Sequence, residues 1–462
     1  MLSARGPATL ISACRQAPGV HSTARSVSSA PSTDLPLSGI RVLELGQVIA
    51  GPFCGQLLAH FGAEVIKVEP PKTGDPLRVW RELDVDGTSP WFRSMGRNKK
   101  SVAIDMRMEE GRQLVKQLAL KSDVLLENFK PGTLEKWNLG PAALHPHNPA
   151  LIFTRVSGYG QTGPWASRPG YASVCEAESG FRYINGHPDE TGALSGAPVR
   201  PNISLGDSVA GLHAAFGTVL ALLARRTKTD RGEDGGQVVD VSIMESMLNL
   251  MEGIVPEYDR KGKSPRTPTP ACPPPPPPPP PDAPSPDAPS PDAPQPPAFI
   301  VIGANGDTLY AKLMHAIGRG DLVGPAYAHN QHRVQHQAQI EAAISAWTRA
   351  HTVADAERVM RAAGVPVGRV NSVREVVACE QVRARGAVED VWVGKGGEEG
   401  EGEGEGGWNV KMPKVFPVLE GYDVRTRWAG PDLGAHTDEV LTGELGVGQA
   451  ELQRLRKEGV IG

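Results

Sequence analysis

The chain has 462 residues, enough for one large domain or two medium ones, and a formal net charge of −4 at pH 7. It lacks the clustered basic stripe that is typical of nucleic-acid binding, and it has no run of about 18 apolar residues, so we expect neither a nucleic-acid partner nor a membrane span. Its five cysteines form no C-x-x-C pair. We therefore predict no metal site and no disulfide framework.

The first 35 residues differ in composition from the rest. Arg5, Arg15 and Arg25 lie among many alanines and serines, and the first acidic residue is Asp34. A cationic, hydroxylated and acid-poor segment is typical of an organelle transit peptide. We predict a transit peptide at 1–35 and a place in the mitochondrial matrix; a plastid, or a plain disordered tail, is the alternative.

Strand and helix patterns alternate from residue 36 to 258. Helical spacing of apolar residues predicts helices at 53–61, 109–120 and 208–224. Strand–helix–strand units imply parallel pairing. We predict an α/β fold whose large domain, 36–258, holds a Rossmann-like parallel sheet. Its strands are expected at 40–45, 63–68, 100–104, 123–126, 150–156 and 237–242.

Two low-complexity segments interrupt the rest of the chain. Residues 259–298 are rich in proline, which favours an extended polyproline conformation and cannot join a sheet. Residues 394–407 alternate glycine with glutamate and are predicted to form a flexible loop. Between them, 299–393 is predicted to form a smaller α/β domain. There we expect a strand at 299–302, helices at 310–317, 340–350 and 353–363, and a second strand after residue 364.

General catalytic motifs do not identify a function. The chain has no P-loop, no G-x-G-x-x-G after the first strand, no H-E-x-x-H and no G-x-S-x-G. Its twelve histidines show no metal-ligand spacing. These patterns alone indicate only an α/β protein.

A set of short segments, in this order, does resemble one family. Together they resemble family III CoA-transferases of the CaiB/BaiF type, over nearly all of the chain outside the N-terminal segment and the two inserts. Within that family, Arg97–Ser101, Gly158–Pro164 and Pro198–Pro201 are most similar to the mitochondrial succinyl-CoA:glutarate branch. The segments are Gly39–Phe53, Gly62–Glu69, Gly74–Pro76, Arg97–Ser101, Glu127–Gly132, Gly158–Pro164, Leu205–Ser208, Gly364–Gly368 and Leu433–Val440.

The resemblance implies an enzyme that moves CoA from an acyl-CoA, expected to be succinyl-CoA, to a carboxylic or dicarboxylic acid, with glutarate as a candidate. CoA would be a substrate, with no permanently bound cofactor. Residues 408–462 would return to the large domain, and two chains would form an interlocked homodimer. Asp207 matches the nucleophile that forms an aspartyl-CoA thioester. The residues matching CoA-contacting positions are Val48, Ile49, Ala50, Ile104, Asn128, Phe129, Lys136 and Tyr171.

Each matched residue also has a structural interpretation. Asp207 stands where a helix begins, and aspartate is a frequent N-cap. Even there the helix N-terminus would favour an ionised carboxylate. Ile49 and Phe129 fit a hydrophobic core, and Lys136 a solvated surface. A second cation for a dicarboxylate is expected at Arg168 or Arg200.

This chain departs from the family pattern at three places, so a homologue with weak transferase activity is an alternative. Pro70 stands where some relatives carry a CoA-binding arginine, and Ala172 where an acidic residue is common. The proline-rich segment falls where a glycine-rich lid would close.

Two other functions stay open. A related racemase would need a histidine base where this chain has Tyr171, and a free tyrosine ionises only near pH ~10. A non-enzymatic protein could present the polyproline run to SH3, WW or profilin domains.

Overall fold

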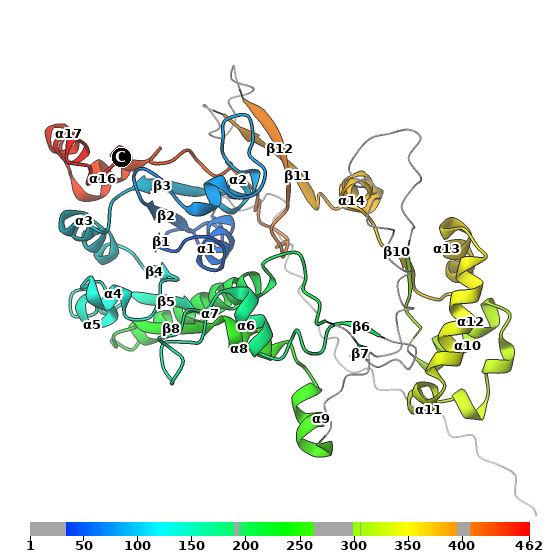
Figure 1. Cartoon of the computed structure of the whole chain (residues 1–462). Coiled ribbons are helices and arrows are strands. Elements are labelled where there is room, and N and C mark those ends of the chain that lie inside the picture. Colours follow the sequence, from blue (N-terminus) through cyan, green and yellow to red (C-terminus); the bar gives the residue numbers. More distant parts are fainter. Residues whose placement is uncertain (1–33, 189–193, 196, 263–298, 305, 395–406) are drawn as a thin grey trace, which may run out of the picture.

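The computed structural model describes residues 34–188, 194, 195, 197–262, 299–304, 306–394 and 407–462 (Figure 1). Three sequence predictions fall almost entirely outside these ranges: the transit peptide, the proline-rich insert and the Gly/Glu loop. They stay predictions, as does the mitochondrial location that rests on the first of them.

A six-stranded parallel sheet forms the centre of the large unit. Its strand order, β3-β2-β1-β4-β5-β8, is that of a doubly wound sheet, with the order reversing between β1 and β4. The predicted α/β class with a Rossmann-like parallel sheet is therefore confirmed. The strands are β1 (Arg41–Glu44), β2 (Glu64–Glu69), β3 (Lys99–Ala103), β4 (Val124–Glu127), β5 (Ile152–Ser157) and β8 (Gln237–Ser242).

Helices cover both faces of this sheet, so that apolar residues on both faces of its central strands are buried. On one face α1 (Ala50–His60) and α7 (Leu205–Thr229) pack against Val42, Val124 and Ile152. On the other face α3 (Glu109–Leu120) packs against the alternating residues of the same strands, whose side chains point to the opposite side of the sheet. The remaining helices of this unit are short: α2 (Pro90–Met95), α4 (Thr133–Lys136), α5 (Pro141–Leu144), α6 (Ala172–Glu178), α8 (Ile243–Asn249), α9 (Ile254–Lys261) and the 3-10 turn η1 (Pro76–Val79).

Element bounds follow the sequence prediction closely, with two informative differences. Helix α3 and strand β8 have the predicted bounds. Helix α1 begins three residues earlier than predicted, because Pro52 occupies its first turn, where a missing N–H costs no hydrogen bond. Helix α7 is longer than predicted at both ends, so that it includes Asp207.

Helix α7 is the one described helix that is long and apolar enough to cross a membrane by length and composition alone. Its small residues Ala210, Ala214 and Ala221 are buried against the sheet. A core helix of this kind passes the same composition test, so the test by itself is weak evidence for a membrane span.

A smaller unit forms a separate group of helices in Figure 1. Strands β9 (Ile300–Ile302) and β10 (Val367–Arg369) pair in antiparallel fashion. The core of this unit includes Tyr310, Met314 and Met360. Its helices are α10 (Asp307–Ala316), α11 (Asn330–Gln335), α12 (Gln337–Arg349) and α13 (Val353–Ala362), with 3-10 turns η2 (Gly320–Leu322) and η3 (Pro325–Tyr327); α14 (Val373–Ala378) and α15 (Glu380–Ala384) follow.

The sequence patterns did not reveal two small antiparallel pairs. Strands β11 (Val388–Val393) and β12 (Trp408–Pro413) pair across the Gly/Glu segment. Strands β6 (His187–Pro188) and β7 (Leu194–Ser195) form a two-residue ladder. Both pairs are too short or too polar on one face for apolar periodicity to indicate them.

The C-terminal segment returns to the large unit, as the fold prediction required. Helices α16 (Thr437–Leu445) and α17 (Gln449–Lys457) lie beside β3 and α3 in Figure 1. The Thr437 hydroxyl accepts a hydrogen bond from the backbone N–H of Ala103 at 3.0 Å. Leu441 and Leu455 are buried in the same hydrophobic cluster as Ile66 and Val115.

We predict that Leu441→Ala lowers the free energy of unfolding of the large unit by about 2–5 kcal/mol, because it leaves a cavity in this shared core. Urea unfolding followed by circular dichroism measures the loss. Leu445→Ala, at a half-buried position of the same helix, is the control and should cost less. Equal losses in the two variants would show that α16 is not part of the sheet's core.

Candidate functional site

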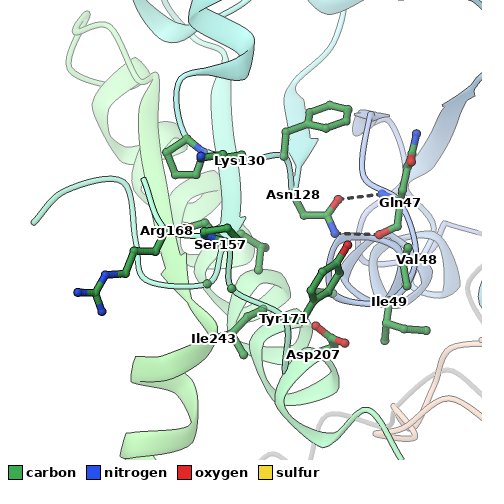
Figure 2. Close-up of a pocket in the computed structure, with 17 residues that line it drawn as sticks. Gln47, Val48, Ile49, Asn128, Lys130, Ser157, Arg168, Tyr171, Asp207 and Ile243 are labelled. Atoms are coloured by element: carbon green, nitrogen blue, oxygen red, sulfur yellow. Dashed lines mark hydrogen bonds between the residues drawn. The ribbon is translucent and has the colours of Figure 1, made fainter. Parts of the chain in front are cut away.

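A pocket of about 330 Å³ opens where β1, β4, β5 and β8 end (Figure 2). The carboxyl ends of β1 and β4 flank the point where the strand order reverses, which is where doubly wound sheets bind ligands. The structure brings seven of the nine predicted site residues to this pocket: Val48, Ile49, Ala50, Asn128, Phe129, Tyr171 and Asp207.

The turn after β1 is tied to the end of β4 by one side chain. Asn128 accepts a hydrogen bond from the backbone N–H of Gln47 and donates one to the carbonyl of Gln47, both at 2.8 Å (Figure 2). Asn128 therefore holds one wall of the pocket against the other.

The same turn is strained at its next residue. Val48 has a φ of +67°, a left-handed conformation that is an outlier for a β-branched residue. Such a residue costs about 1–3 kcal/mol and persists only where its surroundings impose it. The carboxylate of Asp75 accepts the N–H of Val48 at 3.1 Å, and Lys67 donates to the carbonyl of Gly46 at 2.7 Å. These two buried side chains hold the turn in place.

A buried cluster of four charges lies beneath this turn: Glu44, Lys67, Asp75 and Lys99. Lys67 contacts Asp75 at 2.8 Å and Glu44 at 3.1 Å, and Lys99 contacts Glu44 at 2.8 Å. Although burial opposes the charge on Lys67, its ion pairs with Asp75 and Glu44 raise the pKa of its ammonium group. Lys99 also donates to the carbonyl of Pro52 at 2.7 Å, which connects the cluster to the start of α1.

Asp207 lies in the first turn of α7 but does not cap it. The N-cap is Ser204, so the N-cap interpretation of Asp207 is wrong, and the carboxylate is directed into the pocket (Figure 2). Burial, and secondly the carboxylate of Glu176, raise the pKa of Asp207 to about 6. Burial and a neighbouring negative charge thus oppose the stabilisation that a helix N-terminus gives. At neutral pH the group is still mostly ionised.

Helices α1 and α7 approach each other unusually closely beside the pocket. A Cβ added to Gly211 of α7 would lie 2.7 Å from the carbonyl oxygen of Ala50, so only glycine fits there. The first backbone N–H groups of a helix have no partner within the helix. Because Ile49, Ala50 and Asp207 line one pocket, the N-termini of both helices open onto it, and their dipoles favour anionic ligands.

Two loops that cross closely at Gly158 and Gly170 bring Tyr171 to the pocket. A Cβ added to Gly158 would lie 2.8 Å from the Cα of Gly170, so this crossing requires glycine. Tyr171 is 77% exposed and lies at the pocket entrance. Ala172, which stands where an acidic residue was expected, is buried against Gly206 at the start of α7.

The structure does not bring the other two predicted residues to the pocket. Ile104 is fully buried in the hydrophobic core and pairs with Ile461, and Lys136 is exposed at the end of α4. Their proposed contacts with CoA stay predictions. Of the two cations suggested for a dicarboxylate, Arg168 lines the pocket, but its guanidinium points away from Asp207 and lies 4.3 Å from the centre of the Trp165 ring (Figure 2). Arg200 is exposed and is not among the lining residues.

Sequence reasoning missed several lining residues, among them Gln47, Lys130, Ser157 and Ile243. Ser157 ends β5 and Ile243 directly follows β8, whereas Gln47 and Lys130 lie three residues after the ends of β1 and β4. The predicted strand ends were therefore the signal that could have indicated them. Within the described ranges, no group of three or more His, Cys, Asp or Glu residues is placed to hold a metal ion.

Known proteins of similar sequence and structure indicate the family of this chain. A protein-family model described as CoA-transferase family III matches residues 37–437. The chain is 42% identical over 427 residues to succinyl-CoA–D-citramalate CoA-transferase of Chloroflexus aurantiacus, covering 92% of this chain and 98% of the relative. It is 30% identical over 430 residues to mouse succinyl-CoA:glutarate CoA-transferase, covering 92% of this chain and 90% of the relative. A CAIB/BAIF family protein from Brucella suis has a similar crystal structure, with a TM-score of 0.70 at 28% identity, covering 89% of this chain and all of the other.

We predict that Asp75→Asn lowers the free energy of unfolding by about 3–5 kcal/mol, because it leaves the buried charge on Lys67 without its nearest partner. Chemical denaturation measures this loss. The control is Asp390→Asn, which removes an exposed ion pair with Lys411 at 2.7 Å and should cost ~0–1 kcal/mol. A loss below 1 kcal/mol for Asp75→Asn would show that the cluster does not hold the turn.

Proposed function

The chain belongs to CoA-transferase family III, and from this membership we propose that it moves CoA from succinyl-CoA to a dicarboxylic acid through an aspartyl-CoA thioester on Asp207. One observation carries the proposal: the carboxylate of Asp207 is partly buried in a pocket onto which two helix N-termini open. A carboxylate in such a place can act as a nucleophile toward a thioester.

In the first half of the proposed reaction, one oxygen of Asp207 attacks the thioester carbonyl of the donor. The C–S bond breaks, CoA leaves as a thiolate, and a mixed anhydride joins the donor acyl group to Asp207. The thiolate then attacks the side-chain carbonyl carbon of Asp207. The anhydride C–O bond breaks, the donor acid leaves as a carboxylate, and Asp207 carries CoA as a thioester.

The acceptor acid reverses these steps and restores the carboxylate of Asp207. Its carboxylate attacks the aspartyl thioester and releases the thiolate, which then attacks the acceptor carbonyl of the new anhydride. Each attack develops negative charge on a carbonyl oxygen. The unpaired backbone N–H groups at the start of α1 are the donors that we propose for that charge. Water must stay out, because it would hydrolyse the anhydride and the thioester alike.

The proposed substrates rest on the relatives and on the charge of the pocket. The two relatives described above are named for succinyl-CoA as one substrate and for a dicarboxylic acid, D-citramalate or glutarate, as the other. Lys130 and Arg168 are the cationic residues among those lining the pocket. Because the guanidinium of Arg168 points away from Asp207, Lys130 is the cation that we propose to pair with the second carboxylate of such an acid. The racemase alternative is disfavoured, because both relatives are named as transferases.

We predict that Asp207→Asn and Asp207→Ala abolish CoA transfer from succinyl-CoA, with a loss of at least ~1,000-fold, because the nucleophile is removed. Purified protein is incubated with succinyl-CoA and with glutarate, citramalate or a monocarboxylate, and the acyl-CoA products are separated by chromatography. Hydroxylamine added during turnover should label Asp207 in the wild type only.

Asp230→Asn, at the other end of α7, is the matched control and should keep wild-type rates. Full transfer by the Asp207 variants, or an unlabelled Asp207 in an active wild type, would overturn the mechanism. Transfer to the monocarboxylate alone would overturn the dicarboxylate proposal and leave the aspartyl step standing.

We also propose that the chain forms a homodimer through the outer face of α7. Leu212, Phe216, Leu220 and Leu223, here called the α7 patch, are 48–64% exposed. Their spacing of four, four and three residues places them on one side of the helix. A continuous apolar patch of this kind is unusual on a monomer and is typical of a protein interface. The interlocked arrangement that the family resemblance implies would cover it.

We predict that Phe216→Asp converts the dimer to a monomer at micromolar concentration, because it places a charge in the centre of the α7 patch. Analytical ultracentrifugation measures the mass. Val85→Asp, at an apolar residue that is 86% exposed in a loop, is the control and should stay dimeric. A Phe216→Asp protein with the dimer mass would assign the interface to another surface.

A further inference from the structure

Glu176 is a second carboxylate next to Asp207 that the mechanism above does not use. It lies in α6, and it is only 1% exposed. One of its oxygens accepts the backbone N–H of Gly206 at 3.1 Å, in the first turn of α7. Gly206 directly precedes Asp207, so Glu176 holds the start of the helix that carries the nucleophile.

We propose that Glu176 is a positioning residue that keeps a fixed negative charge beside Asp207 and thereby favours its conversion to the uncharged acyl form. This inference rests on the proposed function, since it concerns the acylation of Asp207. It adds a role for a residue outside the lining of the pocket.

Glu176 packs closely against the start of α7. A Cβ added to Gly206 would lie 3.3 Å from Cγ of Glu176, 3.1 Å from Ile243 and 3.4 Å from Cβ of Ala172. The buried carboxylate of Glu176 is thus held between α6 and α7 by the N–H of Gly206 and the guanidinium of Arg182.

Arg182 is the counter-ion of Glu176, and it lies toward solvent. Its guanidinium contacts the second oxygen of Glu176 at 3.0 Å, and its side chain is 21% exposed. Because water screens the partly exposed cation better than the buried anion, the pair leaves a negative potential on the side of Asp207. The direction of the pKa shift at Asp207 agrees with this.

Other titratable groups of the neighbouring elements are expected to influence the charge of Asp207 less than Glu176 does. The thiol of Cys175 is neutral at physiological pH, because burial raises its pKa to about 11. Glu178 is exposed and accepts a hydrogen bond from Tyr159. The guanidinium of Arg168 is held by Trp165. The remaining groups are Tyr171 at the pocket entrance, His213 on α7, bonded to Ser246, and the exposed Glu245 on α8.

Acylation and protonation remove the same negative charge from Asp207. A fixed anion nearby therefore favours both acylation and protonation of Asp207. If its effect is electrostatic, it changes the free energy of the two reactions by the same amount. Removing the anion should lower the pKa of Asp207 and also lower the population of the aspartyl intermediate. Removing the counter-ion should do the opposite. A purely structural role for the pair would not produce opposite shifts.

The test compares Glu176→Gln and Arg182→Gln with the wild type through the pH dependence of kcat/KM. Transfer needs the ionised Asp207, so the rate falls as pH drops through its pKa. In Glu176→Gln this acid limb should move down by roughly one pH unit, and in Arg182→Gln it should move up. Hydroxylamine trapping at Asp207 in single turnovers should fall about tenfold in Glu176→Gln, since one pKa unit corresponds to that factor.

Glu178→Gln, an exposed carboxylate on the same helix, is the control and should leave the acid limb unmoved. An unmoved limb in Glu176→Gln, or shifts of both variants in one direction, would overturn the inference. Should Glu176→Gln fail to fold, the upward shift in Arg182→Gln decides alone. A wild type that transfers CoA without trappable Asp207 would overturn the proposed function instead, so the two failures are distinguishable.

Discussion

The buried cluster of Glu44, Lys67, Asp75 and Lys99 is the constraint on which the site depends. Two buried cations and two buried anions are stable only if each finds its partner, and removing any one leaves an uncompensated charge. The cluster joins β1, β2 and β3 and reaches through Asp75 to the turn that leads into α1. The left-handed backbone of Val48 can persist because this cluster holds it.

From this turn the geometry of the pocket follows. The strained turn sets where α1 begins, and glycine at position 211 lets α7 approach α1 closely enough for the two N-termini to open onto one pocket. Asp207 stands between opposing influences: the helix N-terminus favours its charge, whereas burial and Glu176 oppose it. A carboxylate that is ionised but not strongly stabilised is suited to a reaction in which it must lose its charge and regain it.

Much of the fold was predictable because it rests on local patterns. Runs such as Asp123–Leu126 and the periodicity of Glu109–Leu120 report burial on a strand or a helix face directly. The β11–β12 pair was not predictable, since its two strands are half exposed and a low-complexity segment separates them. Asp207 itself was identified only through the family resemblance, because an aspartate at a helix start is by composition an ordinary cap.

Residue order alone therefore established the α/β class and the parallel strands, since these depend on side-chain type and near-neighbour spacing. The nucleophile candidate came from the resemblance of short segments to the family. Tertiary structure decided which predicted residues meet. It placed Ile104 in the core and Lys136 on the surface, and it brought Glu176 to the start of α7 from 30 residues away. Such contacts depend on the packing of distant segments, and no local pattern in the chain encodes the distance between them.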